Sequence, residues 1–418
     1  MMLIQAPKGT HDVLSSEVYK WHYVEKVIQE ICSLFGFKEI RIPVFEHTEL
    51  FLRSVGDTTD IVQKEMYTFE DKGGRSLTLR PEGTAGVVRS YIENGMASLP
   101  QPVKLYYLIT AYRYEKMQKG RYREHNQFGA EIFGAKGPEA EAELISMISL
   151  ILDKLGVKEL TLNINSIGCP VCRKDFHASL KSYLGQSLDK LCETCRTRFD
   201  KNPMRILDCK EKSCKDITSN APSIIDFLCN ECDEHFEKFK KLLTDLNIEY
   251  KVNPRIVRGL DYYTKTVFEF VSNKIGAQGT VCGGGRYDGL VEECGGSSTP
   301  GLGFGMGRER LLFVMEASGA EIPEEDTPDI FIAAIGDEAK KHAVQMVSDL
   351  RKTGISAHFD LMDRSLKAQM KYADKLGAKQ VVVLGDDEVK TGRAKLKTMA
   401  TGEEKEIRLD DLNMDIQK

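Results

Sequence analysis

The sequence predicts an α+β protein built from antiparallel strand pairs and helices, followed by a smaller α/β domain. Strand-like runs flank short glycine-containing turns at residues 71–74 and 273–276, as they do in β-hairpins. Strands alternate regularly with helices only after an acidic, proline-bearing stretch at residues 320–328. Within the first part, eight cysteines are concentrated from Cys169 to Cys232, which indicates an inserted, mainly helical segment of different composition.

The composition limits the classes of protein to consider. The 418 residues include 58 lysines and arginines and 63 aspartates and glutamates, for a net charge of −5. This length suffices for two or three domains. The near balance of charge excludes a protein that coats nucleic acid with its whole surface, so any such contact must be local. We find no signal-peptide or membrane-span pattern and expect a cytoplasmic protein, whose cysteines would be thiols or metal ligands.

The N-terminal region predicts a helix and then a strand. Apolar positions from Val18 to Phe35 recur with a period near 3.6, which predicts a helix capped by Ser15 or Ser16 and ended by Gly36. Residues 37–45 then read as a strand interrupted by Pro43. Because proline donates no ladder hydrogen bond, this strand belongs at a sheet edge or a dimer contact.

A hairpin with strands at residues 67–69 and 77–79 leads into the first candidate site residues. Pro81 ends the second strand, and Thr84 could cap the following helix. Glu82 then lies at a strand exit. Its carboxylate could bind a substrate ammonium group there, or be exposed in an acidic turn.

Two longer strands, at residues 105–115 and 123–133, are joined by a basic loop and followed by a helix at 139–155 and a strand at 159–165. The two-residue period of a strand places Arg113 and Glu115 on one face of the first strand. It places His125, Gln127 and Glu131 on one face of the second, whose other face is apolar. Alternation alone favours a solvated surface for the polar face, and the floor of a ligand site is the alternative.

The cysteines between residues 169 and 232 fall into four closely spaced pairs. They are Cys169 and Cys172, Cys192 and Cys195, Cys209 and Cys214, and Cys229 and Cys232. Two such pairs can hold one zinc ion, so four pairs could hold two. The alternative is a reduced, cysteine-rich helical insert without metal. His177 and His235 are additional candidate ligands.

Residues 257–290 contain the densest group of polar and aromatic side chains. A strand is predicted from Val257 to Phe270, and a second from Ala277 to Cys282, followed by a bend at the glycines 283–285. Burial of this group would be costly unless its members bind one another or a polar ligand. They are Arg258, Asp261, Tyr262, Tyr263, Arg286, Tyr287 and Asp288.

Residues 301–307 alternate glycine with large apolar residues, which predicts a strand with one bare face. A flat ring could lie against it, although a neighbouring helix is the favoured interpretation from this pattern alone. The next helix, residues 308–317, begins with Arg308 and Arg310. Cations are unfavourable at a helix N-terminus unless an anion binds there or solvent screens them.

After the linker, strands at residues 330–335, 355–359 and 380–384 alternate with helices at 338–353 and 365–376, which predicts a separate α/β domain. The second helix carries a basic stripe that could be a solvated face or a phosphate contact. Its members are Arg364, Lys367, Lys371 and Lys375.

Residues 257–270 and 283–290 resemble the two histidine-binding signatures of histidyl-tRNA synthetases, and the order of motifs is similar to bacterial members over the full length. Residues 37–45 resemble the class II dimer motif, the hairpin around Arg113 the second class II motif, and residues 301–312 the third. The resemblance implies a class II synthetase fold, with an antiparallel catalytic core at 1–168 and 236–322. It also implies a Cys-rich insertion domain at 169–235 and an anticodon-binding domain at 328–418.

This resemblance further implies a homodimer that activates L-histidine with ATP and Mg²⁺ and then transfers histidine to the terminal ribose of tRNA(His). Arg258 resembles the family's catalytic arginine, which stabilises charge on the α-phosphate. The residues that resemble the histidine pocket are Glu82, Thr84, Gln127, Glu131, Tyr262, Tyr263 and Tyr287. Those that resemble the ATP site are Arg113, Glu115, Arg121, His125 and Arg310. Gln118, Arg364, Lys367 and Lys371 are candidate tRNA contacts.

Two features depart from the family pattern. His125 stands where an aromatic ring commonly stacks near adenine, and zinc in the Cys-rich segment is not a general family property. The competing interpretations are a histidine-sensing regulatory paralogue and a zinc-bearing RNA-binding protein. The first typically lacks the C-terminal domain and the ATP arginines. The second leaves the Arg-Gly-Leu-Asp-Tyr-Tyr segment at residues 258–263 unexplained.

Overall fold

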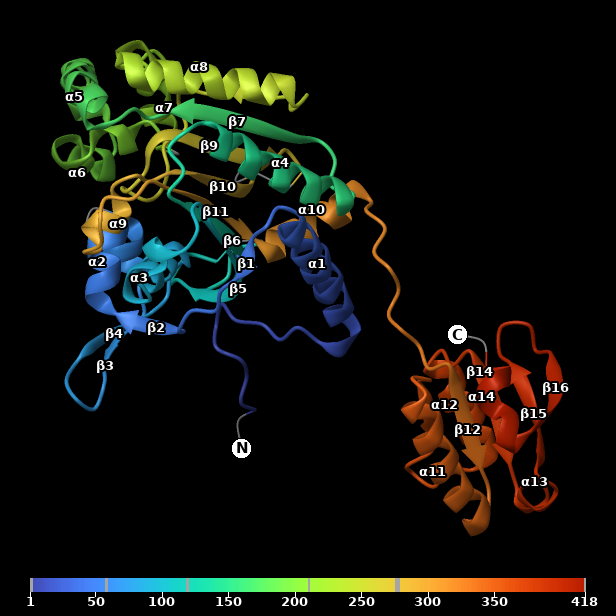
Figure 1. Ribbon diagram of the computed structural model, residues 1–418. Coiled ribbons are helices and arrows are strands. Elements are labelled where there is room, and N and C mark those ends of the chain that lie inside the picture. The colour runs from blue at the N-terminus through green and yellow to red at the C-terminus, as the bar shows by residue number, and fades with distance from the viewer. Residues whose placement is uncertain (1–2, 57–58, 118–119, 210, 275–278, 417–418) are drawn as a thin grey trace. The chain divides into compact units, whose positions relative to one another are not determined.

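The computed structural model describes residues 3–56, 59–117, 120–209, 211–274 and 279–416. The chain divides into two compact units, Met1–Pro323 and Glu324–Lys418. The predicted linker contains no helix or strand, as Figure 1 shows.

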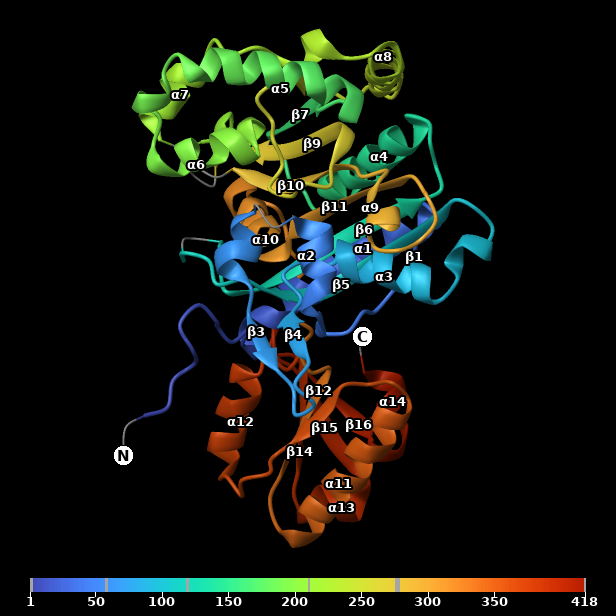
Figure 2. The same ribbon diagram turned by 90° about the vertical axis from the view of Figure 1, so that its left-hand side faces the viewer.

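An eight-stranded sheet organises the first unit, with strand order β1-β5-β6-β11-β10-β9-β7-β8 (Figures 1 and 2). The pairs are antiparallel except β1 with β5 and β7 with β8 at the two edges. A second sheet has the order β2-β4-β3. The strands are β1 Lys38–Glu39, β2 Phe45–His47, β3 Thr68–Glu70, β4 Ser76–Leu79, β5 Val103–Tyr112, β6 Glu124–Phe133, β7 Leu160–Ser166, β8 Lys251–Val252, β9 Thr264–Ser272, β10 Thr280–Arg286 and β11 Gly301–Gly307.

Helices pack on both faces of the large sheet. On one face, α1 (Ser15–Leu34), α4 (Glu139–Lys154), α8 (Asn230–Asp245) and α10 (Arg308–Ser318) share a core with apolar strand residues such as Phe128 and Phe268. On the other face a second core includes α3 (Thr84–Glu93), α5 (Pro170–Gly185) and the inner rows of β5 and β9. The other helices of this unit are α2 Thr48–Val55, η1 Ile61–Glu65, η2 Met96–Ser98, η3 Leu188–Lys190, α6 Glu193–Lys201, η4 Pro203–Ile206, α7 Lys212–Thr218, η5 Ile224–Phe227 and α9 Leu290–Glu293.

The N-terminal predictions are largely confirmed. Helix α1 ends before Gly36, whose φ of 75° is the left-handed conformation that glycine tolerates. The predicted serine cap is wrong, because the capping position is Leu14 and no side chain accepts a hydrogen bond there. Strand β1 lies at the sheet edge, as the proline predicts, but the run at 37–45 is divided between β1 and β2.

The central hairpin starts later than predicted. Residues 257–263 form an irregular loop, and β9 begins only at Thr264. The glycines 283–285 belong to β10 instead of a bend, since they pair with both β9 and β11. The predicted strand start at Ala277 lies outside the described residues. Because residues 257–263 form a loop, Arg258, Tyr262 and Tyr263 project from this loop beside the sheet.

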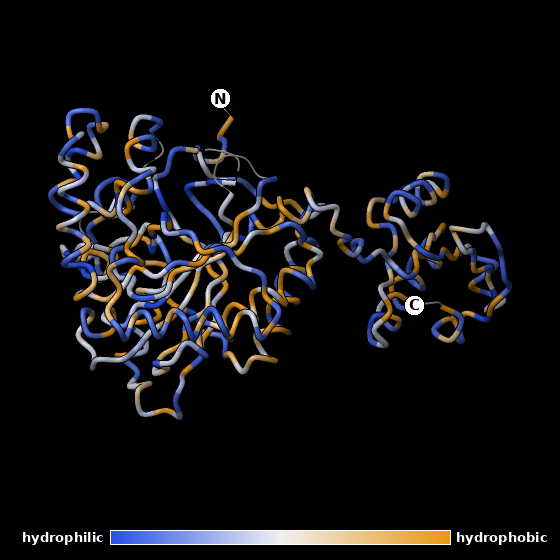
Figure 3. Tube along the Cα trace, turned by 90° about the horizontal axis from the view of Figure 1, so that it is seen from above, coloured by the Kyte–Doolittle hydropathy of each residue, from blue (hydrophilic) through white to orange (hydrophobic). Residues whose placement is uncertain are grey.

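The second unit contains a five-stranded sheet with order β13-β12-β14-β15-β16. The first three strands are parallel, which confirms the predicted α/β alternation, and the C-terminal hairpin β15–β16 was not predicted. No described helix is long and apolar enough to cross a membrane, and hydropathy changes often along the trace (Figure 3). The elements are β12 Ile330–Ala334, α11 Asp337–Lys352, β13 Ala357–Phe359, α12 Leu366–Lys375, β14 Gln380–Leu384, α13 Asp386–Thr391, β15 Arg393–Thr398, β16 Glu404–Arg408, η6 Leu409–Asp411 and α14 Leu412–Asp415.

Candidate active site

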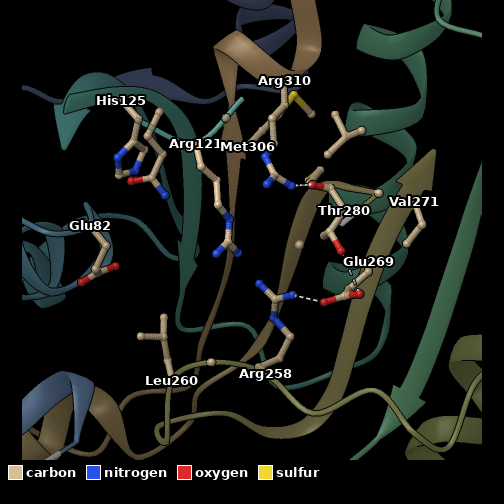
Figure 4. Close-up of a pocket in the computed structure, with 18 of the residues that line it drawn as sticks. Glu82, Arg121, His125, Arg258, Leu260, Glu269, Val271, Thr280, Met306 and Arg310 are labelled. Carbon is tan, nitrogen blue, oxygen red and sulfur yellow. Dashed lines mark hydrogen bonds and ion pairs between the residues drawn. The ribbon is translucent and has the colours of Figure 1, made fainter. Parts of the chain in front are cut away.

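A cavity of about 570 Å³ lies over the middle strands of the large sheet (Figure 4). The polar face of β6 and the charged residues just after β5 face this cavity, so the solvated surface favoured by alternation is wrong. The predicted residues that line it are Glu82, Thr84, Arg113, Glu115, Arg121, His125, Gln127, Arg258, Tyr262, Tyr263 and Arg310. Glu131 and Tyr287 are buried next to this lining.

A row of three glycines crosses the floor of the cavity. Strand register aligns Gly129 of β6 with Gly305 of β11, and Gly305 with Gly283 of β10. Side chains of neighbouring segments fill the space that a Cβ would take. A Cβ at Gly129 would lie 2.3 Å from the Tyr107 hydroxyl, and one at Gly305 would lie 2.2 Å from Gln127 Nε2. The bare face of β11 thus accommodates side chains, and the expected neighbouring helix is wrong.

Arg258 lies over the third glycine of this row. A Cβ at Gly283 would be 2.5 Å from Arg258 Nη1. The guanidinium forms an ion pair with Glu269, whose other carboxylate oxygen accepts a hydrogen bond from Thr280 Oγ1 at 3.3 Å (Figure 4). Burial opposes the charge of Arg258, but Glu269 outweighs it and raises the pKa, so this arginine stays cationic.

The backbone near Arg258 is held by the Cys-rich segment. Arg205 Nη1 donates to the carbonyl oxygen of Arg258 at 2.7 Å. Asn202 Nδ2 donates to Asp261 Oδ1 at 3.0 Å. Asn202 follows α6 and Arg205 belongs to η4, so this stretch supports the loop that presents Arg258 and the tyrosines to the cavity.

Glu131 is a fully buried carboxyl group that accepts three hydroxyl hydrogen bonds. The donors are Thr84 Oγ1 at 2.8 Å, Tyr107 Oη at 3.0 Å and Tyr287 Oη at 2.5 Å. Burial raises the pKa of Glu131 to about 8, although these hydrogen bonds act in the opposite direction. The three hydroxyl groups therefore replace the water that Glu131 loses on burial.

The backbone N–H groups at the start of α3 are hydrogen-bonded by the side chain of Glu82 and not by that of Thr84. Its carboxylate accepts hydrogen bonds from the backbone N–H groups of Thr84 and Ala85, both at 2.8 Å, and the capping position is Gly83. Burial raises the pKa of Glu82, while these two hydrogen bonds lower it. The prediction that Thr84 caps the helix is wrong. Glu82 is 2% exposed and lines the cavity, which also rules out the alternative of an exposed acidic turn.

The other end of the cavity is strongly basic. Arg121 forms an ion pair with Glu115 at 3.2 Å, and Arg113 lies 3.7 Å from the same carboxylate. Arg310 donates to the carbonyl oxygens of Gly120 at 3.2 Å and Thr280 at 2.7 Å. Three guanidinium groups that face one cavity at this spacing suit a polyphosphate ligand.

The two arginines at the start of α10 have different surroundings. Arg308 forms an ion pair with Glu25 and lies 5.4 Å from the centroid of Trp21, so protein groups balance its charge. Arg310 faces the cavity, as Figure 4 shows. The expectation of a bound anion at this helix N-terminus therefore applies to Arg310 alone.

His125 is a neutral imidazole in this environment. Burial lowers its pKa to about 3, and Arg113, Arg310 and Arg121 contribute to the shift. An uncharged ring beside three guanidinium groups can stack on a purine without adding a fourth positive charge.

Arg286 and Asp288 belong to a buried ionic network outside the cavity lining. Arg286 Nε donates to Glu141 Oε1 at 2.7 Å, and its Nη1 contacts Asp288 Oδ1 at 3.2 Å. His235 Nε2 lies 2.7 Å from the same Glu141 oxygen. This network joins α4, α8 and the end of β10. The charge of buried Arg286 is therefore balanced by Glu141 and by half-buried Asp288, whereas Tyr287 binds Glu131.

The eight cysteines form two clusters of four. Cys169, Cys172, Cys229 and Cys232 make the first, and Cys192, Cys195, Cys209 and Cys214 the second, with all sulfur atoms of a cluster within 4.8 Å of one another. Within the described part of the chain, neither cluster includes His177 or His235.

The candidate tRNA contacts differ in their surroundings. Gln118 lies outside the described residues. Lys367 and Lys371 are exposed on α12. Arg364 precedes that helix, forms an ion pair with Asp360 at 2.6 Å and stacks 4.3 Å from the centroid of Tyr372.

Some residues of the site were not predicted. Glu269, Thr280 and Gly283 position Arg258, and Tyr107 contacts Glu131. Glu269 alternates with the apolar positions Phe268 and Phe270 of a strand, and an isolated carboxylate between two core residues is the signal that could have identified it.

Comparisons with known proteins agree with this geometry. A family model described as histidyl-tRNA synthetase matches residues 9–170 and 217–311, and one described as an anticodon binding domain matches residues 329–418. The histidine–tRNA ligase of Acetivibrio thermocellus is 70% identical to this chain, with 98% of this chain and 99% of that protein covered. That of Caldanaerobacter subterraneus subsp. tengcongensis is 59% identical, with the same shares covered. The crystal structure of apo S. aureus histidyl-tRNA synthetase is 42% identical, covers 100% of both chains and has a TM-score of 0.85. This chain therefore has the class II synthetase fold and belongs to the histidyl-tRNA synthetase family.

Proposed function

We propose that this chain is a histidine–tRNA ligase. It converts L-histidine and ATP to histidyl-adenylate and pyrophosphate, and then transfers histidine to the 3′-terminal ribose of tRNA(His) with release of AMP. The observation that carries this proposal is a single cavity that places a cationic arginine, Arg258, between a buried carboxyl cluster and a group of three arginines. Such a cavity can hold an amino acid and a nucleotide in contact.

The carboxyl cluster binds histidine in this proposal. Glu82 contacts the α-ammonium group with Thr84 beside it, and Gln127, Tyr262 and Tyr263 complete the walls. Glu131 and Tyr287 recognise the imidazole, because a buried carboxyl group selects a ring N–H that most amino acids lack. The Thr84 and Tyr287 hydroxyls now bound to Glu131 are the groups that would rearrange around the ring.

The basic end of the cavity binds ATP. Arg113 holds the α-phosphate, Arg121 and Arg310 hold the outer phosphates and the adenine side, and His125 and Glu115 contact the adenine. Arg258 stabilises the charge that develops as a histidine carboxylate oxygen attacks the α-phosphorus and pyrophosphate leaves. The step needs positioning and charge stabilisation, and no protein nucleophile takes part.

A divalent cation fits the same end of the cavity. The carboxylates of Glu115 and Glu309 line it and provide the hard oxygen donors that Mg²⁺ prefers. When bound with ATP, Mg²⁺ would neutralise phosphate charge.

The remaining parts of the chain account for tRNA binding and assembly. We assign residues 1–168 and 236–322 to the catalytic core, 169–235 to the insertion and 328–418 to the anticodon-binding domain. Lys367, Lys371 and Arg364 contact tRNA phosphates in this scheme. The chain acts as a cytoplasmic homodimer, and exposed Phe45 and Phe69, which pack edge to face on the small sheet, support a dimer contact.

Histidine-dependent exchange of labelled pyrophosphate into ATP tests the proposal. The parent chain should exchange label, and Arg258→Ala should reduce the rate by about 10²–10³-fold, as for removal of one transition-state charge contact. Arg393→Ala is a matched control, because the Arg393 side chain is 65% exposed and belongs to the second unit. A folded parent that binds histidine without exchange would refute the ligase and favour a histidine-sensing regulatory paralogue. Binding of tRNA without histidine would favour an RNA-binding protein.

A further inference from the structure

The two cysteine clusters have the geometry of closed metal sites. In a tetrahedral zinc site with Zn–S bonds of ~2.3 Å, neighbouring sulfur atoms lie ~3.8 Å apart. The Sγ atoms of Cys169 and Cys172 are 3.6 Å apart, those of Cys169 and Cys229 are 3.9 Å apart, and those of Cys192 and Cys209 are 3.8 Å apart. A disulfide would need a separation of ~2.05 Å, and all eight cysteines are free.

The backbone around the clusters also brings the cysteines of each pair together. Three of the C-x2-C pairs start a helix, with Cys169, Cys192 and Cys229 at the capping positions of α5, α6 and α8. The second cysteine of each pair then lies in the first turn of its helix, and both sulfur atoms of the pair belong to the same cluster. Backbone N–H groups donate to sulfur in each cluster, from Cys229 to Cys172 at 3.2 Å and from Cys192 to Cys214 at 3.3 Å.

We propose that each four-cysteine cluster binds one Zn²⁺ ion, and that the second ion fixes the segment that supports Arg258. Four sulfur ligands fill a tetrahedral coordination sphere and leave no position for substrate, so both sites are structural. This inference goes beyond the proposed activity, since no cysteine of either cluster lines the cavity.

The first site joins the two ends of the insertion. Cys169 follows β7 directly and Cys229 precedes α8, so one ion would hold together chain positions 60 residues apart. Arg173 follows Cys172 in α5 and donates from Nε to the carbonyl oxygen of Ile167 at 3.1 Å, which ties the start of α5 to the end of β7.

The second site brackets the segment that touches the Arg258 loop. Cys195 lies in α6 and Cys209 follows η4, so the ligands flank Asn202 and Arg205. These are the two residues that donate to Asp261 and to the Arg258 carbonyl. Loss of this ion would release both contacts without removing any residue of the cavity.

Metal analysis of the full-length chain, purified without chelators, tests the proposal. We expect about two zinc ions per chain in the parent, and about one in each of the double variants C169S/C172S and C192S/C195S. Cys294→Ser, which changes a cysteine outside both clusters, should retain both ions. A parent with fewer than two zinc ions, or with iron and sulfide instead, would overturn the assignment.

Two further measurements test the proposal even if one of the double variants fails to fold. Cobalt(II) reconstitution of the parent should give the intense visible bands of tetrahedral thiolate coordination at two equivalents. Hydrogen–deuterium exchange should increase at residues 202–208 and 256–261 in C192S/C195S but not in C294S. Unchanged exchange at these residues in a variant that has lost one ion would refute the supporting role. None of these readouts depends on ligase activity.

Discussion

Gly283 gives a direct test of how the floor of the cavity positions Arg258. In Gly283→Ala, the new methyl group would lie 2.5 Å from Arg258 Nη1, 2.7 Å from Nη2 and 2.8 Å from Cζ. Ordinary contact between such atoms is ~3.5 Å, so the guanidinium must move by about 1 Å. All three nearest atoms belong to the end of the Arg258 side chain, so the guanidinium is the group that must yield.

This displacement should affect catalysis much more than stability. A misplacement of ~1 Å costs on the order of 10²-fold in rate, or about 2.7 kcal/mol in activation free energy. The free energy of unfolding should change by less than ~1 kcal/mol, since alanine loses less backbone entropy than glycine and only a flexible side-chain end must yield. We therefore expect a lower kcat for pyrophosphate exchange, with the KM for histidine changed less.

Two comparisons isolate the effect. Gly185→Ala is the matched control, because its Cβ would lie 3.8 Å from Phe199 Cζ, outside the cavity, and the rate of this variant should remain near that of the parent. In a double-mutant cycle, Gly283→Ala should reduce the rate little further once Arg258 is alanine. Full additivity of the two changes, or an unchanged kcat in Gly283→Ala, would refute the reasoning.

Three other predictions concern separate parts of the chain. Glu141→Ala should lower the free energy of unfolding by about 3–5 kcal/mol, because it leaves the buried guanidinium of Arg286 without its main partner; denaturant unfolding would show this, and a loss below 1 kcal/mol would contradict it. Glu131 has a folded-state pKa of about 8, above its unfolded value, so the native chain binds the extra proton and stability should fall as pH rises from about 4.5 to 8. In Glu131→Gln, the free energy of unfolding should decrease over this pH range by roughly 1–4 kcal/mol less than in the parent. An unaltered pH profile of unfolding would count against the raised pKa of Glu131. Lys371→Glu should weaken tRNA binding and reduce its salt dependence by about one unit of slope while leaving pyrophosphate exchange intact; equal loss of both activities would point to misfolding instead.

Much of the fold follows from local patterns in the sequence. Pro43 predicts the edge position of β1, and Asp71 with the two glycines after it predicts the hairpin β3–β4. Alternation with helices predicts the parallel strands of the C-terminal unit. The hairpin β15–β16 was missed because lysine and glutamate dominate it, and such residues rarely mark strands. Helix α3 was misread at its start, since a carboxylate two residues upstream, Glu82, provides the acceptor expected from Thr84.

The sequence predicts which residues belong to the site, but it does not predict that they line a cavity. Alternation along β6 identifies which side chains share a face, yet it contains no information about what covers that face. The row of Gly129, Gly305 and Gly283 comes from three strands far apart in sequence, and only strand register aligns them. The pair of Arg258 with Glu269 likewise depends on how a loop folds back over a strand. Long-range pairing of this kind has no signal in a single sequence.

The pairing of β7 with β9 has a consequence for how the chain folds. These neighbouring strands flank the Cys-rich segment, and Ser166 pairs with Thr266 across it. Closing a loop of roughly a hundred residues costs about 4 kcal/mol of chain entropy before any strand contact forms, more than closing the short β5–β6 hairpin. The large sheet should therefore assemble from its hairpins first, with β7 added late. A nascent chain that emerges from the ribosome would remain open at this edge until residues near 270 have been made.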